Sequence, residues 1–280
     1  MGKVIMSGIV PQLVAPLSVD PVLNNNSWET ISKVSQMGLA AQYWSVGDTK
    51  TITINGKVGN TTFSNLSVDA FILGFNHNSS REGSNRIHFQ IGKINGTLVG
   101  LVDGNYGNNT STTGAFTMYT SNTNRGGWNN SHMRKTVLGS NSASATSPAA
   151  NTLLAALPAD LRAVMKPATK YSDNTGGGSN TASYVTSTTD YLFLLSEFEY
   201  HGARTRANSA EKNYQAQYDY YKVGNSKIHY KHNATGTRAS PWCRSVDSDS
   251  PNYFCRVSNY GGSTYYSAHY SYGVAPGFCV

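Results

Sequence analysis

The chain has 280 residues, of which 39% are hydrophobic and 13% are charged, and 18 are tyrosines. This length allows one large domain or two smaller ones with a buried core, and no apolar run reaches the roughly 18 residues of a bilayer span, so no membrane insertion is expected. The net charge of +7 is scattered, with no run of more than two basic residues, whereas nucleic-acid-binding proteins cluster such charge; no nucleic-acid partner is expected.

The first predicted region, residues 1–40, is an N-terminal arm followed by a short helix. Prolines interrupt the apolar character of residues 1–19, so no signal-peptide core forms, and the arm is expected to be a docking segment. Asn26 followed by Glu29 resembles a capping box, which predicts a helix over residues 27–37.

The middle of the chain alternates short strand patterns with a few helix patterns. The predicted strands cover residues 49–58, with a hairpin turn at Asn55-Gly56, and then 70–76, 86–91, 98–102, 115–119 and 191–198, the last being a strand or buried segment. The predicted helices run from a cap at Asn130 or Ser131 to 138, over 151–166, and from a cap at Asn208 or Ser209 to about 222. This mixture indicates an α+β fold with few short helices around an antiparallel core.

Motifs for enzymatic chemistry do not occur in the sequence. Phosphate-binding, dinucleotide-binding, zinc-protease and serine-hydrolase signatures are all missing, so no catalytic residue, metal or cofactor is predicted. Glu197 and Glu199 alternate on a predicted strand and would share one face, but a carboxylate pair needs convergent geometry that sequence does not supply.

The three cysteines, Cys243, Cys255 and Cys279, all lie near the C-terminal end of the sequence. Their odd number and their spacing argue against a zinc site. We interpret them as small buried hydrophobic residues, with one disulfide and a spare thiol as the alternative.

Residues 240–280 combine two kinds of sequence. The frame segments, 242–245, 254–257 and 273–280, contain Trp, Cys, Arg, Phe, Val, Pro and Gly. The filler positions between them are almost entirely Tyr, Ser, Asn, Asp, Thr and His. Antibody loops use a similar set, because Tyr gives a large contact area at low entropic cost and Ser and Asn give adaptable hydrogen bonds. The pattern predicts a displayed binding surface on a stiff frame.

Three stretches of the sequence carry a resemblance to a known family. They are residues 126–134, with Gly-Gly-Trp before Ser-His-Met-Arg, residues 157–170, which begin Leu-Pro-Ala-Asp-Leu-Arg, and the frame of residues 242–278. In this order they resemble phage and bacterial proteins with a C-type-lectin-like fold, which include the variable proteins of diversity-generating retroelements. The resemblance implies a C-type-lectin-like domain over residues 41–280, with 240–280 as its variable region. From the residues alone, the Gly-Gly-Trp turn is interpreted as a packing corner.

In such retroelements, adenines of a template copy are miscopied into the 3′ end of the target gene, so that Asn codons become Ser, Tyr, His, Asp or Thr codons. The resemblance therefore implies fourteen diversified, ligand-binding surface positions: Asp247, Ser248, Asp249, Asn252, Tyr253, Ser258, Tyr260, Ser263, Tyr265, Tyr266, Ser267, His269, Tyr270 and Tyr272.

The function expected from the resemblance is recognition without chemistry. The chain would be a receptor-binding adhesin of a phage tail, on the virion surface or at a cell surface, with a protein or glycan ligand on a cell surface. Its N-terminal arm would contact other virion proteins, and self-assembly as a trimer would multiply weak contacts. The calcium-binding Glu-Pro-Asn and Trp-Asn-Asp motifs of sugar-binding lectins are missing, so no calcium is expected. The alternatives are a non-diversified structural virion or bacterial surface protein and an enzyme similar to the formylglycine-generating enzymes.

Overall fold

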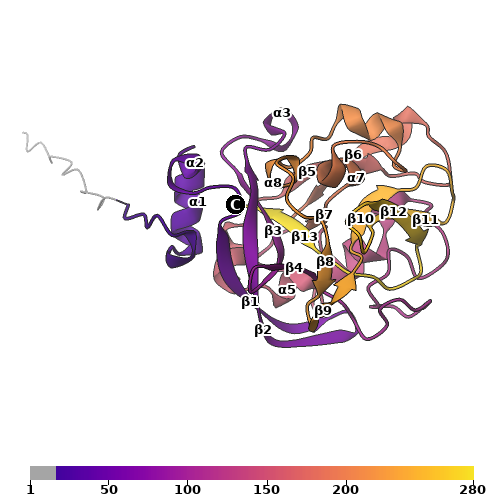
Figure 1. The fold of residues 1–280 in the computed structure, drawn as a ribbon, viewed down its shortest axis with the longest axis horizontal. Helices are drawn as coiled ribbons and strands as arrows, with labels where there is room; N and C mark the ends of the chain where they lie inside the picture. The colour runs from indigo at the N-terminus through magenta and orange to yellow at the C-terminus, as the bar shows by residue number, and fades with distance from the viewer. Residues whose placement is uncertain (1–16) are drawn as a thin grey trace, which may run out of the picture.

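A computed structural model describes residues 17–280 as an α+β fold with mostly antiparallel sheets, which confirms the predicted fold class at this level. The helices α1 and α2 lie at one end of the molecule beside the main sheet and the C-terminus (Figure 1). The three-stranded sheet of β10, β11 and β12 lies at the other end. The two sheets therefore separate the N-terminal elements from the predicted binding surface.

The N-terminal elements pack on the same core as the rest of the chain. After the short η1 (Leu23–Asn25) come α1 (Trp28–Gln36) and α2 (Ala40–Tyr43). Trp28 of α1 packs edge-on against Phe89 and Phe278 at 5.4 and 5.8 Å, so the predicted boundary at residue 40 does not separate two cores. The helix is confirmed, but its cap is Ser27, whose hydroxyl accepts a hydrogen bond from the Thr30 amide at 3.0 Å. The docking arm predicted for residues 1–40 falls, for residues 1–16, outside the described residues.

The main sheet has the order β1-β2-β3-β4-β8-β9. Its strands are β1 (Thr49–Val58), β2 (Thr61–Phe75), β3 (Ile87–Ile94), β4 (Thr97–Gly100), β8 (His229–Lys231) and β9 (Ala234–Ala239), and α3 (Ser79–Glu82) lies between β2 and β3. The C-terminal strand β13 (Pro276–Cys279) joins it by pairing with both β3 and β7 (Phe193–Leu194). The chain's last strand is thus fixed at the centre of the fold.

The first hairpin turns at a different place from the one predicted. The register pairs Val58 with Thr61, so the turn is at Gly59-Asn60, while Asn55-Gly56 lies inside β1 at an irregularity of the register. Gly59 has a φ of 54°, and a Cβ on it would meet the carbonyl oxygen of Gly114 at 2.0 Å. Only glycine fits this contact, and this tertiary contact fixes the turn there.

Two predicted helices are interrupted. Residues 151–166 form α5 (Leu153–Ala156) and α6 (Ala159–Val164), because a proline at 158 forces the residue before it into an extended conformation. The helix predicted after residue 208 is only η4 (Ser209–Asn213) and α8 (Asp219–Lys222). Between them, the Tyr218 amide donates to the Glu199 carbonyl at 3.1 Å. Because this amide bonds to a distant carbonyl, it does not form the hydrogen bond that would continue a helix.

Two predicted strands are also wrong in part. Residues 115–118 are buried and Tyr119 is half-buried, but they form no strand, because their amides bond to separate loops; the Phe116 amide, for example, donates to the Asp103 carboxylate at 2.8 Å. Of residues 191–198 only β7 is extended, since Ser196 and Glu199 form a capping box that starts α7 (Glu197–His201). Glu197 and Glu199 therefore lie on a helix rather than on one strand face.

The predicted packing corner at residues 126–134 is confirmed. Trp128, in α4 (Gly127–Asn130), is fully buried, and its indole donates to the Asp190 carboxylate at 2.8 Å. Arg134, in the π-helical η2 (Met133–Leu138), forms an ion pair with the same carboxylate at 2.7 Å. Asp190 is the last residue of β6 (Val185–Asp190), which pairs with β5 (Ala168–Asp173). The short η3 (Ala182–Tyr184) lies between these two strands.

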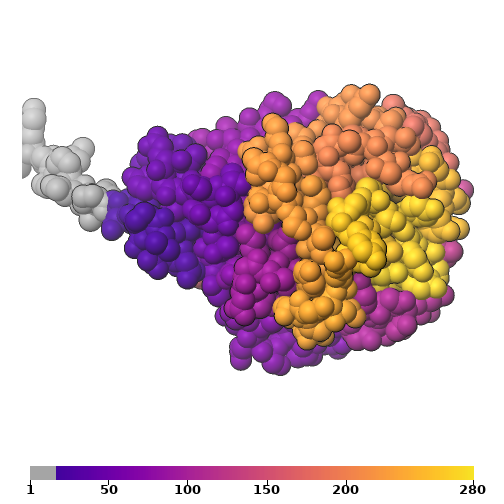
Figure 2. All heavy atoms as spheres, viewed as in Figure 1, coloured from indigo at the N-terminus to yellow at the C-terminus, as the bar shows by residue number. Residues whose placement is uncertain are grey.

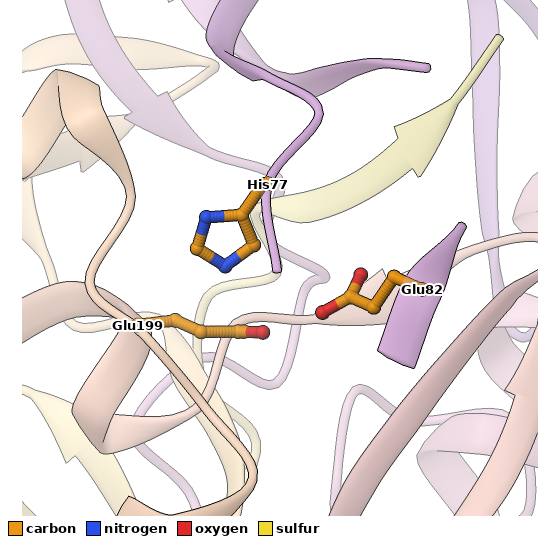
Figure 3. Close-up of side chains that lie close together, drawn as sticks. All are labelled: His77, Glu82 and Glu199. Atoms are coloured by element: carbon orange, nitrogen blue, oxygen red, sulfur yellow. The ribbon is translucent and has the colours of Figure 1, made fainter. Parts of the chain in front are cut away.

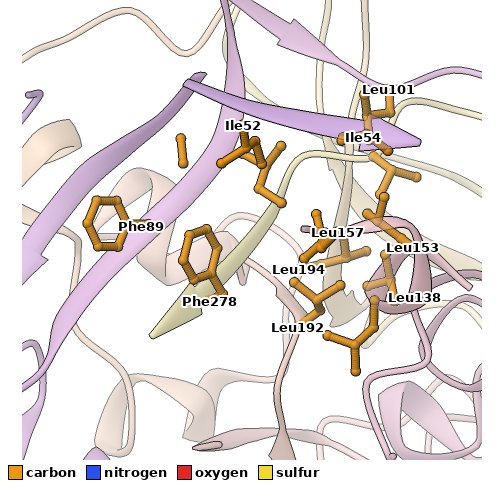
Figure 4. Close-up of a cluster of buried hydrophobic side chains, with 14 of the residues drawn as sticks. Ile52, Ile54, Phe89, Leu101, Leu138, Leu153, Leu157, Leu192, Leu194 and Phe278 are labelled. Carbon is orange, nitrogen blue, oxygen red and sulfur yellow. The ribbon is translucent and has the colours of Figure 1, made fainter. Parts of the chain in front are cut away.

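Two hydrophobic clusters form the core of these elements, and Phe89 and Phe278 belong to the larger one. Figure 4 shows Phe89 of β3 and Phe278 of β13 facing each other, with leucines from the helical region below β1. These two rings stack at 5.2 Å and contribute to closing the C-terminal strand onto the sheet. Within residues 17–280, no helix has the length and apolar character needed to cross a bilayer.

Candidate functional site

The frame segments lie in the C-terminal sheet and in β13, and they are mostly buried. This sheet consists of β10 (Trp242–Val246), β11 (Tyr253–Val257) and β12 (Ser263–Ser267), in that order, so β12 is its edge strand. Every residue of β10 and of the segment 273–280 is buried, and in β11 Phe254, Cys255 and Val257 are buried as well. The three cysteines are buried free thiols, which confirms our interpretation of them and rules out the disulfide alternative in this structure.

Eleven of the fourteen predicted surface positions are exposed or half-buried. Tyr260, at the tip of the β11–β12 hairpin, is the most exposed, at 77%. The eleven are Asp249, Asn252, Tyr253, Ser258, Tyr260, Ser263, Tyr265, Tyr266, Ser267, His269 and Tyr270. They gather on one sheet and the loops beside it, at the end of the molecule far from the N-terminal elements, where Figure 2 shows the C-terminal residues in yellow.

The prediction of surface exposure is wrong for Asp247, Ser248 and Tyr272. Asp247 is 2% exposed, and its carboxylate accepts a hydrogen bond from the Asp249 amide at 2.9 Å. The Ser248 hydroxyl donates to the Arg206 carbonyl at 3.0 Å. The Tyr272 ring packs edge-on against Trp242 at 5.3 Å. These three side chains hold the loops in place. The sequence does not reveal this role, because the exposed filler positions use the same residue types.

A hollow of about 440 Å³ lies at the edge of this sheet. The strand register places Tyr265 and Tyr266 on opposite faces of β12, so a hollow that both side chains line must follow the free edge of that strand. The lining residues are Tyr253, Arg256, Thr264, Tyr265, Tyr266, Ser267 and Tyr270. Five of them are predicted ligand-binding positions, whereas Arg256 and Thr264 were not predicted.

The tyrosines of the hollow are arranged in two pairs. The rings of Tyr253 and Tyr265 stack at 5.1 Å, and the Arg206 guanidinium lies 4.4 Å from the Tyr265 ring. The rings of Tyr266 and Tyr270 meet edge-on at 4.8 Å. Such contacts hold the rings in defined positions, so the aromatic surface is ordered before any ligand arrives.

Arg256 differs from the tyrosines around it because it belongs to the frame. Its guanidinium lies 4.1 Å from the Tyr272 ring and 4.8 Å from the Tyr266 ring. Its Nε is buried without a hydrogen-bond partner among residues 17–280, and burial lowers the pKa of Arg256 from its ordinary value. The strand alternation gives no signal for this residue, since it places Arg256 on the same face as Phe254, which is buried.

Comparison with known proteins assigns the chain to a family. A family model described as a domain of unknown function, DUF6273, matches residues 109–280. The chain belongs to the DUF6273 family. No curated protein and no solved structure matches the chain. The DUF6273 match includes the whole C-terminal sheet and the hollow, so both are parts of the family's domain.

A buried cluster of charged side chains joins the DUF6273 domain to the part of the chain before it. Glu199 of α7 accepts from Arg244 Nη2 at 3.0 Å and from Lys170 Nζ at 3.1 Å, and Lys170 is also 2.6 Å from Glu82. Arg244 Nη1 pairs with the second Glu199 oxygen as well. The two cations lower the pKa of Glu199 against the opposing effect of its burial.

His77, Glu82 and Glu199 converge in this cluster and have the donor types of a metal site (Figure 3). However, the Lys170 ammonium group bonds to both carboxylates and so supplies the positive charge that a metal ion would bring. Burial lowers the pKa of His77 to about 3, and its ring stacks on Tyr218 at 3.8 Å. These contacts fit a structural charge cluster better than a vacant metal centre.

Further buried carboxylates of the DUF6273 domain accept hydrogen bonds from the loop of residues 205–207 and from serines of the C-terminal sheet. Glu197 accepts hydrogen bonds from the amides of Thr205, Arg206 and Ala207 and from the Ser263 hydroxyl. Burial raises the pKa of Glu211 to about 7, against hydrogen bonds that include one from Ser245 at 2.7 Å. The carboxylates under the C-terminal sheet therefore position loops rather than form an open acid–base pair.

Proposed function

We propose that this DUF6273 protein is a ligand-binding protein that displays a variable Tyr/Ser/Asn-rich surface on a C-type-lectin-like scaffold, as a receptor-binding adhesin of a phage tail. The mechanism is recognition without chemistry. Ordered tyrosines act as anchors, and Ser, Asn and His side chains adapt their hydrogen bonds to the ligand.

The division between buried frame and exposed filler is the observation that carries this proposal. Apart from Arg256, the frame residues are buried, while eleven filler positions share one exposed region and five of them line one hollow. A protein that separates stability from specificity needs this arrangement, because substitutions at the exposed positions leave the core contacts intact. Short antiparallel strands, short helices and long loops are also what the C-type-lectin-like assignment predicts.

The positions of the two ends of the molecule support a role at the surface of a larger assembly. Residues 17–45 lie opposite the C-terminal sheet, so an N-terminal attachment would leave the filler positions free to meet a ligand (Figure 2). A trimer would add avidity to weak single contacts. Light scattering of the purified chain tests this part, and a strictly monomeric protein would remove it.

The state of the cysteines supports binding rather than cysteine catalysis. Burial raises the pKa of Cys243 and Cys255 well above the ordinary thiol value and that of Cys279 to about 12. A reactive cysteine needs a thiolate that its substrate can reach. This disfavours the alternative of an enzyme similar to the formylglycine-generating enzymes.

Deep sequencing of the 3′ end of the gene in a growing population of its source tests the proposal. We expect substitutions at the eleven exposed filler positions and none at Trp242 or Phe278. Asp247, Ser248 and Tyr272 should vary less, because their side chains hold loops. Codons for exposed asparagines outside the region, such as Asn122 and Asn213, are the control. An invariant 3′ end would contradict diversification and favour the structural-protein alternative.

A further inference from the structure

The hollow of the C-terminal sheet contains one charged group without a partner. The hydrogen bonds and ion pairs within residues 17–280 include none from the Arg256 guanidinium, although the side chain is half-buried. The ionisable groups that act on its charge are Tyr272, Tyr106 and Tyr266, and none is a carboxylate. A half-buried charge without a counter-ion is unfavourable, and contact with tyrosine rings offsets only part of this.

Other arginines near the sheet differ from Arg256. Arg244 forms ion pairs with Glu199, and Arg204 lies 3.9 Å from Asp249. The Arg206 guanidinium has no ion pair within residues 17–280, but it lies near Asp247, where its charge partly offsets the rise that burial causes in the pKa of that carboxyl. Among these arginines only Arg256 has a buried guanidinium nitrogen without a partner, and the fold places no acidic side chain in the lining of the hollow.

We propose that Arg256 forms an anion-binding subsite that takes the carboxylate of an acidic sugar. A guanidinium presents a planar pair of donors that matches a carboxylate, and a charge-assisted pair in a half-buried site is stronger than a neutral hydrogen bond. This inference rests on the proposed binding function and names the chemistry of one part of the ligand.

The remaining lining of the hollow fits a sugar ring. Thr264, Ser267 and the tyrosines offer hydroxyl groups around the guanidinium, and the tyrosine rings offer flat surfaces. The volume of about 440 Å³ is in the range of sites for small ligands.

Arg256 belongs to the frame, whereas most residues around it are filler positions. A fixed guanidinium surrounded by changing tyrosines, serines and asparagines gives a constant contact for the carboxylate and a variable contact for the rest of the glycan. The overall charge of +7 adds a weak attraction for acidic ligands.

Calorimetric titration of the full chain with glucuronate and, separately, with glucose tests the subsite. The two sugars share a ring and differ in the carboxylate. We expect measurable binding of glucuronate at low salt and at least about tenfold weaker binding of glucose, as expected for the loss of one charge-assisted hydrogen bond. Equal affinity for the two sugars, or binding of neither, would overturn the proposal.

Two arginine variants sharpen the test. Arg256→Gln should lose the preference for glucuronate, whereas Arg238→Gln should keep it, because Arg238 is exposed over Tyr260 and lies outside the hollow. Unchanged glucuronate binding by folded Arg256→Gln would refute the role of Arg256. If Arg256→Gln does not fold, the comparison of the two sugars on the wild-type chain decides.

Two further experiments test the class of ligand and separate failure of the Arg256 subsite from failure of the proposed binding function. Binding of an acidic peptide in place of glucuronate would overturn the sugar assignment. If cells of the source's host bind the wild type and Arg256→Gln equally, and Tyr265→Ala weakly, the subsite fails and the proposed function stands. If cell binding depends on neither Arg256 nor the tyrosines, both fail.

Discussion

Arg244 and Arg256 lie on the neighbouring strands β10 and β11, yet their surroundings are opposite. Arg244 is fully buried, bonds to both oxygens of Glu199 and donates to the Leu194 carbonyl at 2.8 Å. The Arg256 guanidinium lies over two tyrosine rings and lines a hollow. The sheet thus carries a charge satisfied by an ion pair on β10 and an unpaired charge at the hollow on β11.

This difference shows which region maintains the fold and which is free to change. Breaking a buried ion pair leaves a charge without compensation, so the cluster around Glu199 is sensitive to any substitution. The tyrosines around Arg256 make contacts that other side chains could replace, because water reaches them. The following predictions test this contrast, from the largest expected effect to the smallest.

Arg244→Met should destabilise the protein by about 3–5 kcal/mol, because it leaves the buried Glu199 with one cation instead of two. The matched variant Arg256→Met should change stability by about 1 kcal/mol or less, since it removes an unpaired charge and two ring contacts. Urea denaturation of both variants measures this. Similar losses would show that the two arginines do not differ as the structure indicates.

Trp242→Ala should also destabilise the protein by about 3–5 kcal/mol, since a large buried aromatic side chain leaves a cavity. Tyr265→Ala, at a half-buried ring of the hollow, should lose about 1 kcal/mol and weaken ligand binding. Thermal melting and a binding assay on the same preparations separate the two effects. If Tyr265→Ala unfolded the protein as Trp242→Ala does, the division into frame and filler would be wrong.

Stability should rise as the pH is raised from about 4 to about 7. Burial lowers the pKa of His201 and His229 from 6.5 to about 4, so unfolding takes up protons below 6.5, and each histidine contributes on the order of 2 kcal/mol that is lost in acid.

Glu211 acts in the opposite direction over the same range. Burial raises its pKa from 4.5 to about 7, so its contribution is full below 4.5 and is lost as the pH rises through 7. Urea midpoints measured across this range should therefore rise more steeply in Glu211→Gln than in the wild type. An identical slope would contradict the raised pKa of Glu211.

Tyr260→Ser should change stability by less than about 0.5 kcal/mol, because this side chain at the hairpin tip is exposed. Its effect on binding of the proposed sugar acid should also be small, since Tyr260 does not line the hollow. A thermal melt and a glucuronate titration check both expectations. A large change in either would extend the functional surface beyond the hollow to the hairpin tip.

The sequence by itself determined the broad class of the fold and the division of residues 240–280 into buried frame segments and mostly exposed filler positions. The alternation of apolar residues predicted β1, the last residues of β2 and the first residues of β3, because strand periodicity is a local property. Apolar frame residues and free cysteines were predicted to be buried and are buried.

Only the tertiary structure decided what depends on contacts between distant residues. The helix predicted after 208 is interrupted where the Tyr218 amide bonds to Glu199, and the hairpin turns at Gly59 because of a contact with Gly114. Tyr272 is a core residue whereas Tyr270 lines the hollow, although the two are almost adjacent in the same composition. The sequence contains the residue types, but the register of β11 and β12 and the packing on Trp242 set which tyrosines and which arginine face the solvent.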